Sequence, residues 1–277
     1  MSSPSPAVQA SPVPSPAAPA GTVLLRRDEG GVATLTLNRP AQFNALSDEL
    51  LTALQKALDA IAADASVRVV VLAGAGKAFC AGHDLKEMRQ NPGLDYQRGL
   101  FGRCARVMTT LTSMPQPVIA RVHGVATAAG CQLVATCDLA VAADAARFAV
   151  SGINVGLFCS TPSVALGRAM ARKQAMELLL TGDFIDAAEA KARGLVNRVV
   201  AADALDAEVK KLTDSICGKS QVAVSMGKGI FYRQLELGVD AAYQLAGETM
   251  ACNMMAEDAG EGIDAFIARR KPEWKGR

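Results

Sequence analysis

Residues 117–144 read PVIARVHGVATAAGCQLVATCDLAVAAD, and this stretch decides the fold. PVIARVHG (117–124) is an apolar run of strand length, and LAVAAD (139–144) is a second one. Between them, AAGCQLVATCD (128–138) has the pattern of a helix that starts in small residues. Short apolar strands separated by a helix are typical of a sheet that is buried on both faces. The stretch therefore predicts an α/β fold.

The flanking segments extend this pattern. VRVVVLAG (67–74) is another buried strand, and two alternating apolar runs on either side of Gly30 and Gly31 predict a hairpin. Ser47 is expected to cap a helix because apolar residues follow it at helical spacing. These residues are Leu51, Leu54, Leu58 and Ile61. Beyond residue 160 the chain is mainly helical, with LVNRVV as a last strand, and the final 60 residues are predicted to be wholly helical.

Composition limits the possible partners. The chain has 277 residues, of which 20% are charged and 4% aromatic, and its net charge is +2. These values give no reason to expect nucleic acid or an anionic membrane as a partner. No apolar run reaches the roughly 18 residues that span a bilayer. The seven cysteines form no CxxC pair and there are two histidines, so we expect no metal site and reduced, buried thiols.

The chain divides into three predicted parts. Residues 1–21 contain only Pro, Ala, Ser, Val, Gln, Met and Gly, which predicts a disordered tail. This tail has no Arg or Lys and no apolar core of a signal peptide, so we expect a cytoplasmic protein. Residues 22–213 are expected to form the α/β core, and residues 214–277 a helical region.

Two turns of small residues each follow the end of a strand. KAFCAGHDLKEM (77–88) follows the strand that ends near Gly74, and HGVATAAGCQL (123–133) follows PVIARV. Free N–H groups in such turns point at negative charge, and small side chains let a ligand approach the backbone. Two N–H groups that converge on one carbonyl oxygen form an oxyanion hole. Taken alone, such a turn more often reflects plain close packing of a strand against a helix.

Five stretches resemble one family of enzymes, in order along the chain. They are LNRPAQFNAL (37–46), VLAGAGKAFCAGHDLKEM (71–88), HGVATAAGCQLVATCDLAVAADAARF (123–148), LTGDFIDAAEAKARGLVNRVV (180–200) and EGIDAFIARRKPEW (261–274). They are similar to enoyl-CoA hydratases of the crotonase superfamily, from about residue 22 to the C-terminus. VGLFCSTPSVALGRAM (155–170) is similar to a divergent branch, enoyl-CoA hydratase domain-containing protein 3.

This resemblance implies a ClpP-like spiral of ββα units with a helical C-terminal trimerisation region. It implies homotrimers or hexamers formed as dimers of trimers, and a role in fatty acid metabolism. It also implies an acyl-CoA thioester as substrate, with CoA as part of the substrate and no separate cofactor. The thioester carbonyl would accept hydrogen bonds from the backbone N–H groups of His83 and Ala129. Ala129 lies in AAG, where the family usually has three glycines.

The resemblance further implies contacts to the CoA moiety. The turn would contact its adenine end through the backbone of His83, Asp84, Leu85 and Lys86. A preceding segment would lie alongside: Asn44, Ala45 and Leu46. The C-terminal helix, with Lys271 and Trp274, would cover the nucleotide of a neighbouring subunit. For Lys86 and Lys271, a solvated surface charge is the alternative interpretation.

Two acids that such hydratases usually carry are missing. The family's two water-activating glutamates match Gln132 and Gly152 in this sequence. An amide does not exchange a proton near neutral pH, and glycine has no side chain. General acid–base groups usually contribute about 10² to 10⁴ each to the rate. We therefore predict that ordinary hydration of a 2-enoyl-CoA is slow or lost.

Other polar groups lie near the expected pocket. The candidates are Ser151, Asn154, Cys159, Ser160 and the imidazole of His83. Cys159 has no evident base partner and is interpreted as a buried thiol, and Ser160 as a helix cap or turn residue. His123 and Asp138 are expected to be structural, and Glu87 is expected to face solvent.

Three functions stay open. The first is an acyl-CoA-processing enzyme, nominally an enoyl-CoA hydratase or isomerase, that stabilises an enolate oxyanion with two backbone amides. The second is a decarboxylase of malonyl-type acyl-CoA, because loss of CO₂ leaves an enolate without needing a base. The AGHD turn (81–84) also resembles that of methylmalonyl-CoA decarboxylases. The third is a non-catalytic acyl-CoA-binding protein.

Overall fold

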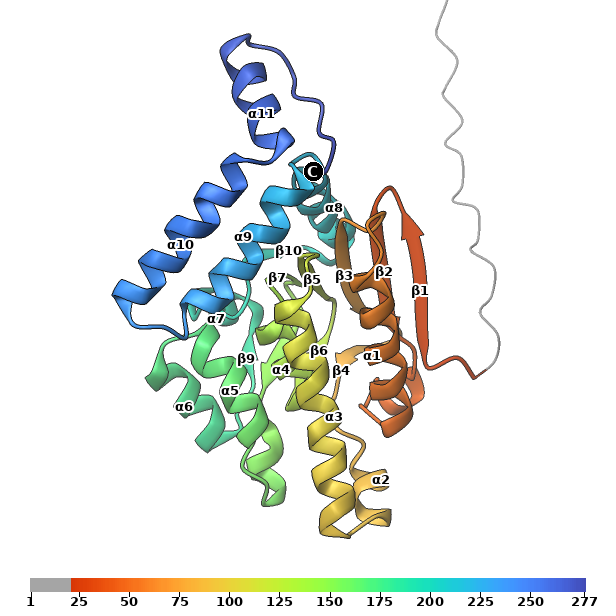
Figure 1. The fold of residues 1–277 in the computed structure, drawn as a ribbon. Helices are drawn as coiled ribbons and strands as arrows, with labels where there is room; N and C mark the ends of the chain where they lie inside the picture. The colour runs from red at the N-terminus through yellow and green to blue at the C-terminus, as the bar shows by residue number, and fades with distance from the viewer. Residues whose placement is uncertain (1–20) are drawn as a thin grey trace, which may run out of the picture.

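The computed structural model describes residues 21–277, which form two sheets surrounded by helices (Figure 1). The larger sheet contains, in order, β1 (Leu24–Glu29), β2 (Val32–Leu37), β3 (Val69–Gly74), β5 (Val118–Val122), β7 (Leu139–Ala143) and β10 (Arg198–Val200). β1 and β2 form the predicted antiparallel hairpin, and the other neighbours in this sheet are parallel. Of the tail predicted at residues 1–21, all but Gly21 lies outside the described residues.

A second sheet was not predicted from the sequence. It contains, in order, β4 (Ala78–Cys80), β6 (Val125–Thr127), β8 (Arg147–Ala149) and β9 (Ile185–Asp186). The first three strands are parallel, and β9 is antiparallel to β8. Each of β3, β5 and β7 leads directly into a strand of this sheet, and helical segments follow, so the core repeats a strand–strand–helix unit. Strands of two or three residues are too short to show a recognisable periodicity.

Helices cover both sheets. They are α1 (Asp48–Ala62), α2 (Leu85–Gln90), α3 (Leu94–Ser113), α4 (Ala129–Thr136), α5 (Ser160–Ala169), α6 (Arg172–Thr181), α7 (Ala187–Ala192) and α8 (Leu205–Cys217). Short 3₁₀ segments occur at Pro40–Gln42, Ser151–Val155 and Ala202–Ala204. The predicted cap of α1 is confirmed, because Ser47 Oγ accepts a hydrogen bond of 3.2 Å from Leu50 N. In the described part of the chain, no helix is long and apolar enough to cross a bilayer.

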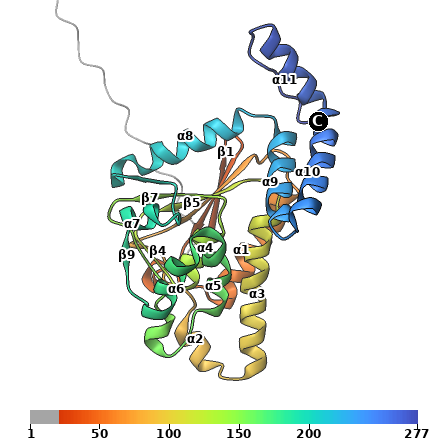
Figure 2. The ribbon, with the colours of Figure 1, turned by 90° about the vertical axis from the view of Figure 1, so that its left-hand side faces the viewer.

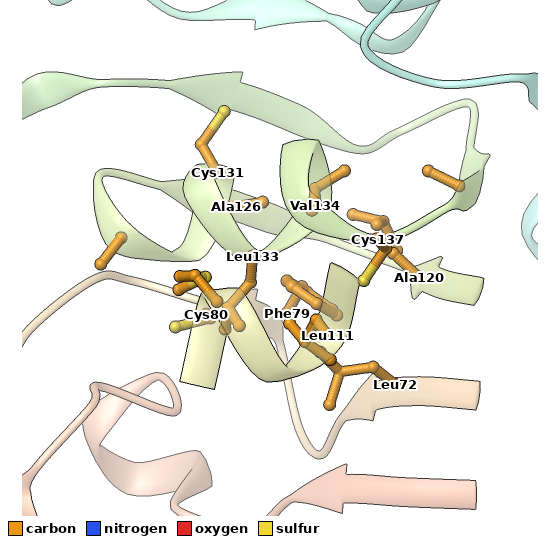
Figure 3. Close-up of a cluster of buried hydrophobic side chains, with 14 of the residues drawn as sticks. Leu72, Phe79, Cys80, Leu111, Ala120, Ala126, Cys131, Leu133, Val134 and Cys137 are labelled. Carbon is orange, nitrogen blue, oxygen red and sulfur yellow. The ribbon is translucent and has the colours of Figure 1, made fainter. Parts of the chain in front are cut away.

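The central strands of the larger sheet, β3, β5 and β7, are buried on both faces, as predicted. Val70 and Leu72 point into the main core, whereas Val69 and Val71 pack on the opposite face under α8. Figure 3 shows part of the main core, where Leu133 and Val134 of α4 pack among side chains from several strands. Five cysteines are buried, and burial raises the pKa of thiols such as Cys80 to about 12. These thiols therefore behave as small core residues.

The C-terminal region consists of α9 (Gln221–Gln234), α10 (Val239–Met254) and α11 (Glu257–Ile267). Both ribbon views show α10 running along α9, away from the sheets (Figures 1 and 2). A buried ion pair joins α9 to the core: Lys228 Nζ lies 2.8 Å from Asp138 Oδ2 and also donates to two backbone carbonyls. The prediction that the last 60 residues are wholly helical is wrong, because residues 271–277 form no helix. The N–H groups of Lys275 and Gly276 donate to the Asp258 carboxylate instead.

Candidate functional site

The structure brings the two small-residue turns together. β4 and β6 are neighbouring parallel strands, and each ends in one of the turns. Carboxyl ends of parallel strands lie at one edge of a sheet, so the turns meet there. A Cβ atom added to Gly82 would lie 2.9 Å from Ala128 Cβ and 3.3 Å from Ala129 N. The two turns are thus in van der Waals contact, and position 82 has room only for glycine.

The first turn is held by the segment that precedes α1. Leu46 pairs with His83 as an isolated bridge, with Leu46 N donating to Gly82 O at 2.7 Å and Asp84 N donating to Leu46 O at 3.1 Å. Gly82 has a φ of +93°, which favours glycine. Asp84 caps α2 and forms an ion pair with Arg39 at 3.0 Å. This bonding leaves the N–H of His83 without an acceptor anywhere in the described chain.

The second turn is strained at Ala128. This residue has φ 50° and ψ −120°, a conformation that glycine adopts readily and an L-residue does not. Such a backbone typically costs about 1–3 kcal/mol and persists where the surroundings fix it. Here Ala128 N donates to Ala149 O at 3.0 Å, and Ala128 O accepts from Gln132 N. Within residues 21–277, the N–H of Ala129, at the start of α4, donates to no acceptor.

Of the three residues in AAG, Gly130 is the one that must be glycine. A Cβ atom there would lie 2.1 Å from Cys80 O, inside the backbone of β4. Close packing of α4 on β4 therefore explains Gly130, and it also fixes the start of α4 beside the first turn.

Gln132 is buried in the first turn of α4. Its side chain is 3% exposed, and its Oε1 atom has no hydrogen-bond partner within the described residues. A buried polar atom without a partner costs about 1–3 kcal/mol. Such an atom requires an explanation, and a bound ligand is one.

Gly152, in contrast, lies where no side chain fits. A Cβ atom at this position would be 2.6 Å from Leu157 O and 2.7 Å from the Sγ atom of Cys159. The thiol of Cys159 points toward Val150 O at 3.5 Å, and burial raises its pKa. The prediction that Cys159 is a buried thiol is thus confirmed. The 3₁₀ segment and the loop that follows it fill the space that a glutamate at position 152 would need.

The ring of His83 is enclosed but unbonded. It packs edge-on against Phe101 of α3, with 5.3 Å between ring centroids. Neither ring nitrogen has a hydrogen-bond partner in the described chain. Burial lowers the pKa of His83 to about 4, and the backbone of Leu46 opposes this shift only in part. The imidazole is therefore neutral at physiological pH.

The residues expected along CoA have different environments. The Asn44 side chain is fully buried, where its amide nitrogen donates to carbonyls that include Ala75 O and Ala78 O, both at 2.8 Å. Ala45 and Leu46 are buried too. Leu85 and Lys86, by contrast, are exposed beside the first turn. The side chains of residues 44–46 are therefore structural.

Lys271 and Trp274 lie beyond the last helix and not in it. Trp274 Nε1 donates to Gly218 O at 2.8 Å, and its ring packs near Gly262 of α11. Lys271 is exposed. Within one chain these two residues are not brought to the turns, because α11 projects away from α2 and α4 (Figure 1).

Several remaining polar groups are structural. His123 Nε2 bonds to Gly76 O at 2.9 Å, and Asp138 holds Lys228 and Tyr232. Glu87 was expected to face solvent, and this is wrong: it accepts hydrogen bonds from Asp48 N and from the Tyr96 hydroxyl. These contacts join elements that are distant in sequence, so no local pattern could have revealed them.

Sequence analysis named Ser151 but missed that its hydroxyl pairs with that of Thr127 beside the second turn. Thr127 Oγ1 and Ser151 Oγ lie 2.7 Å apart and are partly buried. Asn154 has only a long contact of 3.5 Å to Gly182 O. Ser160 was predicted to be a helix cap or turn residue, but it is the first residue of α5, and Cys159 is at the N-cap position. In the described region, no group of three or more His, Cys, Asp or Glu is placed to hold a metal ion.

Comparisons with known proteins extend these observations. A family model described as enoyl-CoA hydratase/isomerase matches residues 27–277. The chain is 47% identical over 248 residues to enoyl-CoA hydratase domain-containing protein 3, mitochondrial, of Xenopus laevis, covering 90% of this chain and 84% of that protein. It is 39% identical to a probable enoyl-CoA hydratase of Rhizobium meliloti, covering 92% and 98% of the two chains.

Solved structures agree with the predicted crotonase-type fold. A crystal structure of an enoyl-CoA hydratase from Mycobacterium smegmatis is 61% identical, has a TM-score of 0.90, and is matched over 91% of this chain and 99% of that one. The crystal structure of human enoyl-CoA hydratase domain-containing protein 3 is 43% identical, with a TM-score of 0.89 and coverage of 91% and 100%. The predicted α/β fold with its helical C-terminal region, and the predicted resemblance to this branch, are therefore confirmed.

The prediction of a cytoplasmic location is contradicted by these comparisons. The relatives from Xenopus laevis, Mus musculus and Homo sapiens are all named mitochondrial. The prediction depended on the missing Arg and Lys in residues 1–21. That composition is not a sufficient basis for assigning a compartment.

Proposed function

Because the chain belongs to the enoyl-CoA hydratase/isomerase family, we propose that it binds an acyl-CoA thioester across the two turns. The thioester carbonyl accepts hydrogen bonds from the N–H groups of His83 and Ala129. The nucleotide end of CoA lies along the exposed residues Leu85 and Lys86. CoA is part of the substrate in this proposal, and no separate cofactor is invoked.

One observation carries the proposal. Two backbone N–H groups without an acceptor in the described chain lie in two turns that contact each other. Neither His83 N nor Ala129 N donates a hydrogen bond within the described chain, and the turns approach to about van der Waals distance at Gly82. Ala129 also stands at the positive end of a helix, where its N–H favours negative charge. Preorganised donors of this kind stabilise an enolate oxyanion, and losing one donor typically costs about 10² to 10³ in rate.

Ordinary hydration is not the reaction we propose, because neither acid of the first turn, Asp84 or Glu87, is free to activate water. Gln132 cannot exchange a proton, and position 152 is closed to any side chain. The nearest carboxylates of the first turn are occupied: Asp84 by Arg39, and Glu87 by Asp48 N and Tyr96. We propose enolate chemistry on a CoA thioester that does not depend on a pair of glutamates.

A direct test compares two glycine variants in a binding experiment. Gly82→Ala should lower the affinity for butyryl-CoA by about tenfold to a hundredfold, because the new methyl pushes the two turns apart. Gly102→Ala is the matched control, since this position in α3 has open space and should bind as the wild type does. Equal affinities of all three proteins, measured by calorimetry, would refute the proposed site. Hydration of crotonyl-CoA at ordinary hydratase rates would refute the prediction that the missing acids make this reaction slow.

Decarboxylation of a malonyl-type thioester is the second candidate, favoured by the same lack of a free acid. In this reaction the bond between the carboxylate carbon and the α-carbon breaks. Its electron pair enters the enolate, CO₂ leaves, and water later supplies a proton to the α-carbon. A retained oxyanion hole is then the main requirement. Release of CO₂ from malonyl-CoA or methylmalonyl-CoA tests it, and binding of both without any release would reject it in favour of a non-catalytic binder.

We also propose that the chain assembles as a homotrimer or as a hexamer of two trimers. No residue of α10 is buried in the single chain, although the helix and its neighbour α11 carry many apolar side chains. The most exposed side chains of α10 and α11 include Val239, Tyr243, Phe266 and Ile267, and Met255 between the two helices is exposed too. Exposed apolar surface of this kind is typical of an interface. Light scattering on the eluted protein checks this, and a monomeric mass would contradict it.

A further inference from the structure

The unbonded amide of Gln132 has a consequence for the choice of substrate. The residue is 3% exposed, and its Oε1 atom has no partner within the described residues. A leucine of similar size would fill the same space without that cost. The amide therefore reduces the stability of the free protein, and a partner supplied by a ligand would remove the penalty.

The position of Gln132 places its amide beside the proposed thioester site. It stands three residues after Ala129 and therefore on the same face of α4. Helical side chains lean toward the N-terminus of their helix, so this side chain covers the turn that contains Ala129 N. If the thioester oxygen is bonded to Ala129 N, the next carbons of the acyl chain lie within reach of the amide.

Among the described residues, the hydroxyls and the thiol beside the second turn are already engaged elsewhere. The hydroxyls of Thr127 and Ser151 bond to each other at 2.7 Å. Gly152 has no room for a side chain, and Cys159 points toward a backbone carbonyl. Of these side chains beside the second turn, Gln132 is thus the one that can still form a hydrogen bond with a ligand.

We propose that Gln132 is a specificity-determining residue that selects CoA thioesters with an oxygen substituent on the third acyl carbon over plain alkyl thioesters. This inference rests on the proposed thioester site. The oxygen is either a hydroxyl, which donates to the amide, or a carboxylate, which accepts from it. An amide serves both, because it carries a donor and an acceptor. An alkyl chain leaves the buried amide unbonded and is discriminated against.

Titration calorimetry with three probes tests the proposal. Wild type should bind 3-hydroxybutyryl-CoA or malonyl-CoA about tenfold tighter than butyryl-CoA, as expected for one buried hydrogen bond. Gln132→Leu should abolish this preference, because leucine offers no hydrogen bond to the oxygen. Gln132→Glu separates the two sources of oxygen. An ionised carboxylate still accepts from a hydroxyl but repels malonyl-CoA, so only a preference for the hydroxyl survives this change.

The outcomes separate this proposal from the proposed thioester site. If butyryl-CoA binds as tightly as the other two probes and Gln132→Leu changes nothing, the inference on Gln132 is wrong and the thioester site stands. If none of the three binds, the thioester site itself is wrong. The melting temperature of free Gln132→Leu supplies a second readout. It should rise by about 2–4 °C, and a fall would mean that the amide is bonded in the free protein and does not await a ligand.

Discussion

Positions 132 and 152 differ in what replaced the acid that the family usually has there. Position 132 holds a glutamine, which is close to glutamate in size but not acidic, and its buried Oε1 atom has no partner among residues 21–277. At position 152 the side chain is gone, and Leu157 and Cys159 fill the space. A glutamate would fit the space of the amide at position 132, whereas no side chain fits at position 152. A missing residue can therefore be restored at one position and not at the other.

Restoring a glutamate at position 152 should have the largest effect on stability. Gly152→Glu forces a side chain against a backbone oxygen and a buried sulfur, so we expect a loss of at least about 3 kcal/mol of unfolding free energy. Gly167→Glu in α5 is the matched control, since its surroundings are open and its stability should change by less than about 1 kcal/mol. Urea unfolding measures both. A Gly152→Glu protein as stable as the control would show that position 152 has room for a side chain.

The pH dependence of stability tests a second buried group. The ring nitrogens of His83, like Oε1 of Gln132, have no hydrogen-bond partner in the described chain. The folded pKa of His83 is about 4 and its unfolded value is near 6.5. As pH falls from 6.5 toward 4, only the unfolded chain takes up this proton, so stability is lost in that window. The contribution is roughly 2 kcal/mol between pH 7 and pH 5. His83→Asn should remove this part of the urea-unfolding difference, and an unchanged difference would contradict the burial of the ring.

Restoring only the first acid should have a moderate effect on activity. Gln132→Glu fits the space of the amide, so we expect a folded protein whose hydration of crotonyl-CoA rises by about tenfold to a hundredfold over wild type. The gain stays partial because position 152 still supplies no second acid. Absorbance at the enoyl band follows the reaction. Full hydratase activity from this single change would mean that the second acid is dispensable.

The strained alanine should give the smallest effect. Ala128→Gly allows the same φ of 50° without the steric cost, so stability should rise by about 1 kcal/mol after the larger chain entropy of glycine is included. Thermal unfolding measures the change. Ala105→Gly, on the exposed surface of α3, is the control and should lose about as much as Ala128→Gly gains. A destabilised Ala128→Gly protein would show that the methyl group is required for packing.

The sequence predicts the fold well where a pattern is long and local. The buried strand at residues 69–74, the hairpin before it and the cap at Ser47 all follow from apolar spacing and helix-start chemistry. The second sheet was missed because its strands have two or three residues. The closure of position 152 was missed for a different reason. It depends on where Leu157 and Cys159 come to lie, and a loop's path is not encoded in any periodic pattern.

For the site, the sequence identified the two turns but not their backbone conformation or their hydrogen bonds. The glycine at position 82 and the small residues before Gln132 indicated close backbone approach, and the structure has it. The positive φ of Ala128 ran against the local preference of alanine and could not be predicted from it. Tertiary contacts from β4 and β8 hold that conformation. Asn44 is another case, because its buried amide nitrogen donates to backbone carbonyls that are distant in sequence.

A crystal structure with bound butyryl-CoA tests the central claim most directly. We predict that the thioester oxygen lies about 3 Å from the backbone nitrogens of both His83 and Ala129. A bound thioester whose oxygen points away from both nitrogens would contradict the account.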